Sequence, residues 1–174
     1  GVEKKDTEVF EPVVSPGQVE TVAALAAEIW REHYEGILSP DQIEYMVEQF
    51  QSASAVDRQI MEEGYRYWLI KADGQEAGYY GACPGEGGLF LSKLYIRRVF
   101  RGRRLASAAI ERCREWCRRE GYPHICLTVN KENRDSIAVY RHLGFEKVRD
   151  QVADIGGGYV MDDYVMQLPV PPEG

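Results

Sequence analysis

The chain has 174 residues, of which 44% are hydrophobic, and a formal net charge of −7. This length and apolar content suit a single domain, predicted here over residues 1–174. No apolar run approaches the about 18 residues of a membrane-spanning helix, and no apolar signal-peptide core is seen in the polar N-terminal segment. We therefore expect a cytoplasmic protein without a membrane partner. The acid excess argues against general nucleic-acid binding and is compatible with a cationic partner.

Alternation and helical spacing predict helices in the first third of the chain and mostly strands after it. A first strand is expected at 8–14, followed by helices over 17–34, 41–52 and 52–64. Three strands follow at 65–72, 76–83 and 89–97, the first two joined by an Asp-Gly hairpin signal. A helix from Leu105, a strand at 124–130, a helix at 133–145 and two strands around Gly156–Gly158 complete the chain. This order predicts one mixed sheet flanked by helices, in the α/β (α+β) class.

The four cysteines, Cys83, Cys113, Cys117 and Cys126, are scattered. Cys113 and Cys117 lie four residues apart on a predicted helix, with His124 downstream, whereas zinc cysteines usually lie on turns. Reduced, partly buried thiols are therefore expected, with no metal site.

Five arginines lie within residues 97–104, where a predicted strand leads through a turn into a helix. A helix N-terminus presents unpaired N–H groups and the positive end of the helix dipole, which together attract a phosphate. Gly102 permits close approach of the backbone, and the arginines add bidentate donors. A diphosphate is the expected guest, although an exposed arginine-rich helix start explains the same residues. The Rossmann and phosphate-loop patterns are absent.

The segment NRDSIAVYRHLGF, which begins 28 residues after Leu105, adds a second set of polar residues. Asn133 is an N-cap candidate, Ser136 lies in the first turn, and Tyr140 follows Asn133 by two helical turns on the same face. Such a face suits the remainder of a long cofactor. The simpler interpretation is a cap and a packed aromatic residue.

Taken together, LSKLYI (91–96), RGRRLA (101–106) and NRDSIAVYRHLGF (133–145) resemble the GCN5-related N-acetyltransferase (GNAT) family. The resemblance implies a mixed, mostly antiparallel central sheet flanked by helices. The phosphate loop of that family reads Arg/Gln-x-x-Gly-x-Gly/Ala and aligns with Arg101–Ala106. Arg104 stands where Gly is usual. It is tolerated if its backbone is helical, and it either reaches a phosphate or crowds the loop.

The resemblance further implies acetyl-CoA as cofactor, held between the strands at 89–97 and 124–130. Backbone groups of Leu94, Tyr95 and Ile96 would pair with the pantetheine arm. Amides from Arg101 through Gly102, Arg103, Arg104, Leu105 and Ala106 to Ser107 would hold the pyrophosphate. Asn133 and Ser136 would contact the cofactor, and Tyr140 would direct its hydroxyl at the thioester sulfur.

The expected reaction is direct acetyl transfer to a primary amine of a small, cationic, polyamine-like substrate, with Tyr140 as the proton donor to the leaving thiolate. Tyr95 is a candidate for relaying the amine proton. Trp30, Tyr34, Glu35, Asp162 and Asp163 are candidates for the acceptor site, and Tyr45 is a further candidate for its lining. Alternation along a strand directs Asp162 and Asp163 to opposite faces, so at most one faces the acceptor.

Three other functions stay open. The chain is a protein N-terminal or lysine acetyltransferase if its acceptor groove admits a peptide. It is a CoA-binding sensor if Arg104, in place of the usual Gly, has abolished catalysis. An RNA-binding module using the arginines lacks the exposed aromatics that stack bases. A homodimer is compatible with the resemblance, although no residue marks an interface.

Overall fold

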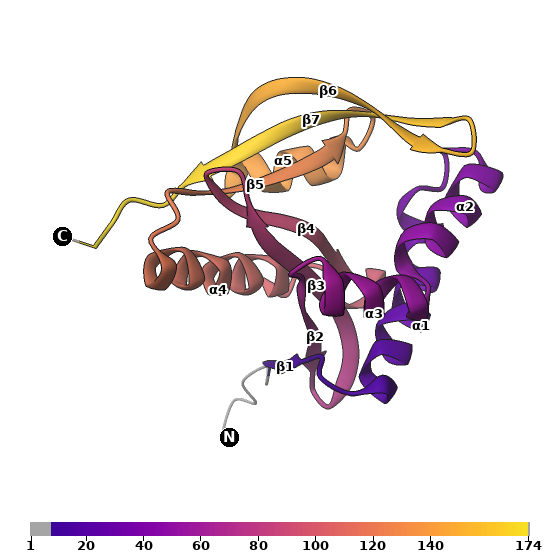
Figure 1. The fold of residues 1–174 in the computed structure, drawn as a ribbon, viewed down its shortest axis with the longest axis horizontal. Coiled ribbons are helices and arrows are strands. Elements are labelled where there is room, and N and C mark those ends of the chain that lie inside the picture. Colours follow the sequence, from indigo (N-terminus) through magenta and orange to yellow (C-terminus); the bar gives the residue numbers. More distant parts are fainter. Residues whose placement is uncertain (1–7, 174) are drawn as a thin grey trace.

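The computed structural model of the protein describes residues 8–173 and shows a curved sheet with helices on both sides (Figure 1). Residues 1–7 and 174, which the single-domain prediction includes, lie outside the described residues. The strands are β1 (Glu8–Pro12), β2 (Arg66–Ala72), β3 (Gln75–Gly85), β4 (Gly88–Ile96), β5 (His124–Asn130), β6 (Glu146–Gly156) and β7 (Tyr159–Pro169). The α-helices are α1 (Pro16–His33), α2 (Pro40–Gln51), α3 (Ala53–Glu62), α4 (Leu105–Glu120) and α5 (Arg134–His142).

The strands form a seven-stranded sheet in the order β1-β2-β3-β4-β5-β7-β6. Every neighbouring pair is antiparallel except β4 and β5, which are parallel because α4 returns the chain between them. The prediction of a mixed, mostly antiparallel sheet flanked by helices is therefore confirmed.

The two faces of the sheet carry separate hydrophobic cores. Alternation sends Leu69 and Tyr79 to a core shared with α1 and α2, and their neighbours Ile70 and Tyr80 to a core shared with α4. All four side chains are almost fully buried. Consequently, any ligand that reaches the middle of the sheet must enter through a gap between strands.

That gap lies between β4 and β5, whose pairing is limited to Leu89↔Ile125 and Phe90↔Cys126. The register of β3 with β4 shifts near Ser92, because Gly81 pairs with Lys93 and Ala82 pairs with Leu91. This irregularity has the form of a β-bulge, which bends a strand and often lies beside a functional site. Beyond the bulge, β4 and β5 diverge, and the edge of β4 that faces β5 has no partner strand over 91–96.

The β6–β7 hairpin extends beyond the rest of the sheet, and its tip reaches α2 (Figure 1). The hydroxyl of Tyr45 donates to the carbonyl of Ile155 at 2.8 Å, and Gln42 donates to the carbonyl of Val160 at 2.9 Å. At the turn, Gly156 has φ +87°, and a Cβ there would lie 2.3 Å from the Tyr45 hydroxyl oxygen. Tyr45 therefore anchors the hairpin, and it lines neither of the two cavities described below.

Within residues 8–173, no helix combines the length and apolar character that crossing a membrane requires. All four cysteines are free, and Cys83, Cys113 and Cys117 are buried, as predicted. The part of the chain that the structure describes contains no cluster of three or more side chains suited to a metal ion.

Candidate active site

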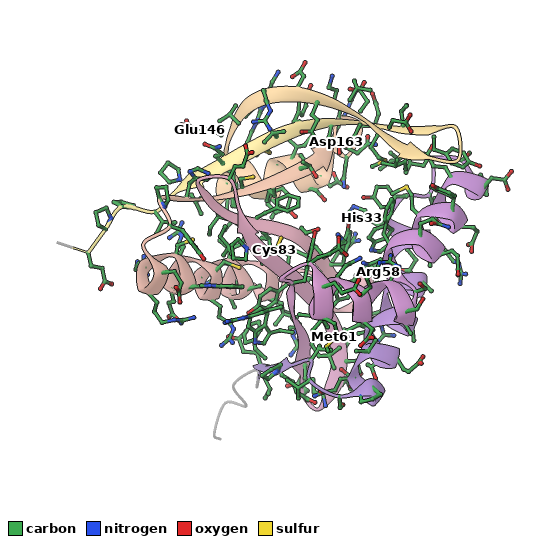
Figure 2. The ribbon with its side chains drawn as sticks, viewed as in Figure 1. His33, Arg58, Met61, Cys83, Glu146 and Asp163 are labelled. Carbon is green, nitrogen blue, oxygen red and sulfur yellow. The ribbon has the colours of Figure 1, made fainter. Side chains whose placement is uncertain are left out.

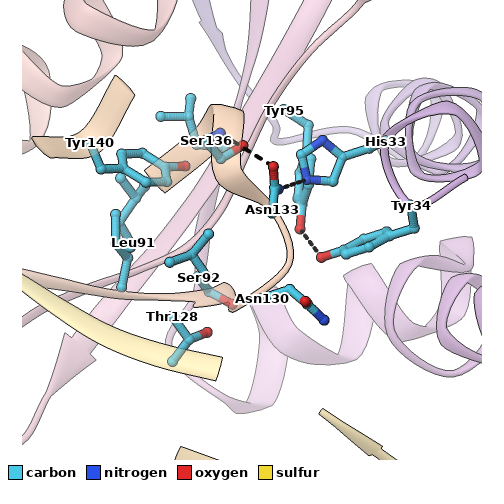
Figure 3. Close-up of a pocket in the computed structure, with 13 residues that line it drawn as sticks. His33, Tyr34, Leu91, Ser92, Tyr95, Thr128, Asn130, Asn133, Ser136 and Tyr140 are labelled. Carbon is cyan, nitrogen blue, oxygen red and sulfur yellow. Dashed lines mark hydrogen bonds between the residues drawn. The ribbon is translucent and has the colours of Figure 1, made fainter. Parts of the chain in front are cut away.

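A small cavity of about 30 Å³ lies where β4 and β5 diverge (Figure 3). It is built from the end of α1, from the two diverging strands and from the start of α5. Its lining residues are His33, Tyr34, Leu91, Ser92, Leu94, Tyr95, Leu127, Thr128, Val129, Asn130, Asn133, Ser136 and Tyr140. The structure thus brings together six of the residues predicted from sequence: Tyr34, Leu94, Tyr95, Asn133, Ser136 and Tyr140.

Tyr140 enters this cavity from α5, on the face of the sheet that α4 covers. Its ring packs edge-on against Phe145 with 5.6 Å between ring centroids. Burial raises the pKa of the Tyr140 hydroxyl, and repulsion by Tyr34 raises it further. The phenol therefore stays protonated at neutral pH and is a proton donor rather than a base.

Asn133 caps α5, because its side-chain oxygen accepts from the backbone N–H of Ser136 at 3.2 Å. Its Nδ2 lies 2.7 Å from Nε2 of His33 at the end of α1 (Figure 3). Burial, together with the nearby charge of Arg101, lowers the pKa of His33 to about 4. The imidazole is therefore neutral at pH 7, so Nε2 accepts this bond and the amide of Asn133 links α1 to α5.

Tyr34 and Tyr95 face each other across the side of the cavity covered by α1, with 3.3 Å between their hydroxyl oxygens (Figure 3). Burial raises the pKa of Tyr34 to about 12 and that of Tyr95 well above its ordinary value. Neither phenol ionises at neutral pH. Tyr95 thus lines the cavity, and its raised pKa makes it unsuited to act as a base.

The two aspartates of β7 point in opposite directions, as strand alternation predicts. Asp162 is exposed and pairs with Lys131 at 2.8 Å. Asp163 is only 7% exposed, and its buried Oδ1 has no hydrogen-bond partner within residues 8–173. Burial raises the pKa of Asp163 to about 6, and the charge of Asp162 raises it further while Lys131 opposes the change. Its charge in turn raises the pKa of Tyr34, so Asp163 lies close to the cavity.

The turn before α4 has the geometry that suits an anion. Gly102 has φ +81°, and Arg104, the N-cap residue of α4, has φ +61° and ψ +22°. The backbone of Arg104 is therefore left-handed. It is not helical, which was the condition under which an arginine is expected to be tolerated at this position. This conformation favours glycine. No side chain caps α4, so the amides of Leu105, Ala106 and Ser107 stay available to an anion.

The five arginines of this region have different surroundings. Arg97 pairs with Glu28 at 3.2 Å, and Arg103 pairs with Asp73 at 2.6 Å. Arg98, Arg101 and Arg104 form no ion pair with any residue of the described chain. The charge of Arg101 helps to lower the pKa of His33, so Arg101 lies near the end of α1 that lines the cavity.

The structure does not bring Trp30 and Glu35 to the cavity. Trp30 is 3% exposed and donates through its indole nitrogen to the hydroxyl of Tyr79 at 2.9 Å, so it belongs to the core beneath α1. Glu35 is exposed in the turn after α1. Ile96 lies at the end of β4. It packs against the core shared with α4 and does not line the cavity.

Sequence reasoning missed His33, Ser92, Thr128 and Asn130, which also line the cavity. His33 lies one position before the predicted Tyr34, and a histidine in the last turn of a helix is more often a favourable partner of the helix dipole. Ser92 and Thr128 lie on opposite sides of the gap, which only the pairing of the strands reveals. No signal in the sequence identified them.

Known proteins resemble this chain in sequence and in fold. The model of the acetyltransferase (GNAT) family matches residues 23–145. The uncharacterized N-acetyltransferase YjgM of Escherichia coli is 30% identical over 91 residues, which are 50% of this chain and 54% of that protein. N-acetyltransferase 8 of Rattus norvegicus is 23% identical over 137 residues, which are 75% of this chain and 57% of that protein. The chain thus spans about half the length of these curated relatives.

Solved structures share the fold. The PaiA N-acetyltransferase of Thermoplasma acidophilum, solved in complex with coenzyme A, superposes with a TM-score of 0.75 and 19% identity. The match covers 94% of this chain and 99% of that one. A GCN5-related N-acetyltransferase from Rhodopseudomonas palustris gives a TM-score of 0.77 at 15% identity, covering 97% and 99% of the two chains. At these identities, the likeness establishes the arrangement of helices and strands.

Proposed function

Because the chain belongs to the GNAT family of acetyltransferases, we propose that it transfers an acetyl group from acetyl-CoA to the primary amine of a small, cationic, polyamine-like substrate. The observation that carries this proposal is the gap between β4 and β5, which Tyr140 enters from the α4 face and Tyr34 from the α1 face. A donor on one face and an acceptor on the other can meet only there. A cytoplasmic location and a homodimer stay predictions.

The residues present fit acetyl-CoA, which supplies an activated acetyl thioester when bound. The free edge of β4 over 91–96 offers backbone groups to an extended amide-bearing arm, in the manner of an added strand. The uncapped N-terminus of α4, with Gly102 and Arg104 in left-handed conformations before it, suits the pyrophosphate. Asn133 and Ser136 line the cavity between these two sites.

Asp163 has the properties of the group that receives the acceptor. A buried carboxylate oxygen without a partner is costly, and an ammonium ion satisfies it. With a pKa of about 6, Asp163 is mainly ionised at neutral pH, so it binds the protonated amine and then takes its proton. The neutral nitrogen can then attack the acetyl group.

Tyr140 acts on the other face. Because its pKa is raised, its hydroxyl carries a proton at any physiological pH and can donate it to the departing thiolate. Its ring is held by Phe145, so the hydroxyl is directed into the gap. Asp163 therefore removes one proton and Tyr140 supplies one, each on its own side of the sheet.

The proposal is tested by titrating thiol released from acetyl-CoA in the presence of spermidine, spermine, simple amines, amino acids and short peptides. Thiol release with small amines supports it. Release with peptides alone would make the chain a protein acetyltransferase. Tight calorimetric binding of acetyl-CoA without release for any amine would favour the sensor, and release that no amine stimulates would contradict transfer altogether.

A further inference from the structure

A second, larger cavity of about 320 Å³ lies beside the first, on the face of the sheet opposite α4. Strands β3, β4, β5, β6 and β7 all contribute to it. Its lining residues are Cys83, Gly85, Glu86, Gly88, Leu89, Phe90, His124, Cys126, Thr128, Arg149, Gln151, Val165 and Gln167. Thr128 lines both cavities, so the larger one adjoins the cavity in which the acetyl group would be transferred.

The register of β7 relates this cavity to Asp163. Side chains alternate between the two faces of a strand. The side chains of Asp163, Val165 and Gln167 therefore lie on the same face of β7. Gln151 on β6 pairs with Asp163, and Arg149 pairs with Val165. Arg149 therefore lies two cross-strand pairs beyond Asp163, at the next pair on the same face, which is about 7 Å along the strand. One small molecule can span this distance.

The larger cavity contains a cation that no carboxylate neutralises. Arg149 is exposed to the cavity and forms no ion pair with any other residue of the described chain. Glu86 also lines the cavity, at the β3–β4 turn, but it lies beyond ion-pair distance from Arg149. A guanidinium group at a cavity wall binds a carboxylate through two parallel hydrogen bonds.

A second cation lies beneath the same surface. Lys93 bonds to the hydroxyl of Ser92, and its ammonium group lies 5.6 Å from the ring centroid of Tyr65. It has no ion pair within residues 8–173, although its charge acts on Cys83, which lines the cavity. Burial lowers the pKa of Lys93 to about 8, while Cys83 and Glu63 oppose the change, so it is mainly charged at neutral pH. Figure 2 labels Cys83 on β3 and Asp163 on β7.

We infer that the larger cavity binds a carboxylate at the far end of the amine acceptor, with Arg149 as its principal ligand. The acceptor is then a zwitterionic amine whose ammonium group meets Asp163 and whose carboxylate meets Arg149. This inference rests on the proposed acetyl transfer to a primary amine. At the far end of the acceptor, it replaces the cationic group of a polyamine with a carboxylate. Arg149 determines specificity and takes no part in the proton transfers.

The test compares three amines of equal chain length as acceptors: aminohexanoate, hexylamine and diaminohexane, with an anionic, a neutral and a cationic far end. Thiol release from acetyl-CoA gives kcat/KM for each. We expect aminohexanoate to exceed the other two by about 10-fold or more, as a charge-assisted hydrogen bond allows. A preference for diaminohexane, or equal values, would overturn the inference and leave the proposed function standing. Silence with all three, and with the wider amine panel, would instead count against the proposed function.

Variants of Arg149 make the test specific. Arg149→Gln should lower the ratio of kcat/KM for aminohexanoate to that for hexylamine to about one. Arg149→Glu should reverse the order in favour of diaminohexane. The matched control is Lys147→Gln, which removes a positive charge from the same strand outside the cavity, where Lys147 pairs with Asp150 at 2.9 Å. If Lys147→Gln lowers kcat/KM for aminohexanoate equally, the preference depends on the overall positive charge of the strand and not on binding of the carboxylate by Arg149.

Discussion

Replacing Asp163 by Asn should stabilise the protein while lowering its activity. The side chains have nearly the same shape, but Asn carries no charge into the buried site. The pKa of Asp163 is raised from 3.8 to about 6 because the carboxyl group is buried beside Asp162. At 1.36 kcal/mol per pKa unit, ionised Asp163 costs the fold up to about 3 kcal/mol. At this chain length, that corresponds to a rise in Tm of about 3 °C for each kcal/mol recovered.

The size of this stability difference depends on pH. Below about pH 4, Asp163 is protonated in both the folded and the unfolded chain, so Asn and Asp should be equally stable. Between about pH 4 and 6, the unfolded carboxyl ionises while the folded one keeps its proton, so the stability of the wild type falls relative to Asn. Above pH 6 the difference should be constant.

Thermal unfolding of both proteins at pH 4, 6 and 8 measures this difference, and thiol release measures the activity of each. Asp163→Asn should lower kcat/KM at least about 100-fold, since a general base typically contributes 10²–10⁴. Asp162→Asn is the matched control, because that exposed carboxylate pairs with Lys131 outside the site. Equal stability of wild type and Asp163→Asn at pH 8, or full activity of the variant, would refute the reasoning.

Three further predictions follow from the same geometry. Tyr140→Phe removes a hydroxyl but keeps the ring against Phe145. The kcat should therefore fall about 10-fold or more, while the calorimetric affinity for acetyl-CoA stays unchanged. Equal losses in kcat and in affinity would contradict a role in donating a proton. His33→Ala should cost about 1 kcal/mol in urea unfolding and weaken acetyl-CoA binding, because Asn133 loses its partner across α1 and α5, whereas His33→Gln should restore much of both. Arg104→Gly should raise the free energy of unfolding by about 0.5 kcal/mol, because glycine adopts φ +61° without strain; a lower Tm would show that the arginine side chain stabilises the loop.

Much of the fold follows from local patterns in the sequence. The helix predicted over 17–34 is observed at Pro16–His33, where Ser15 forms a capping box with Gln18. The strand predicted at 124–130 is observed at His124–Asn130. Such elements are predictable because caps, glycine stops and apolar spacing act within a few residues of one another. The first strand ends earlier than predicted, at Pro12 instead of residue 14.

Site residues that lie within one sequence motif were predictable. Site residues that come together only through the pairing of strands or the packing of helices were not. Asn133, Ser136 and Tyr140 lie on one helix, so their spacing alone places them together. Trp30 differs because its burial beneath α1 depends on Tyr79, which lies 49 residues away. The partnership of His33 with Asn133 spans 100 residues. Contacts of this kind depend on tertiary packing, which no local pattern records.

The most direct test of the central claim follows the acetyl group itself. The protein is incubated with acetyl-CoA carrying an isotopic label in its acetyl group, together with the amine panel, and the products are separated by mass spectrometry. We predict label in an N-acetylated amine, formed in equal amount to free CoA and largely abolished by Asp163→Asn. Label that remains on CoA, or that appears only as acetate, would contradict it, because then no amine accepts the group at the gap between β4 and β5.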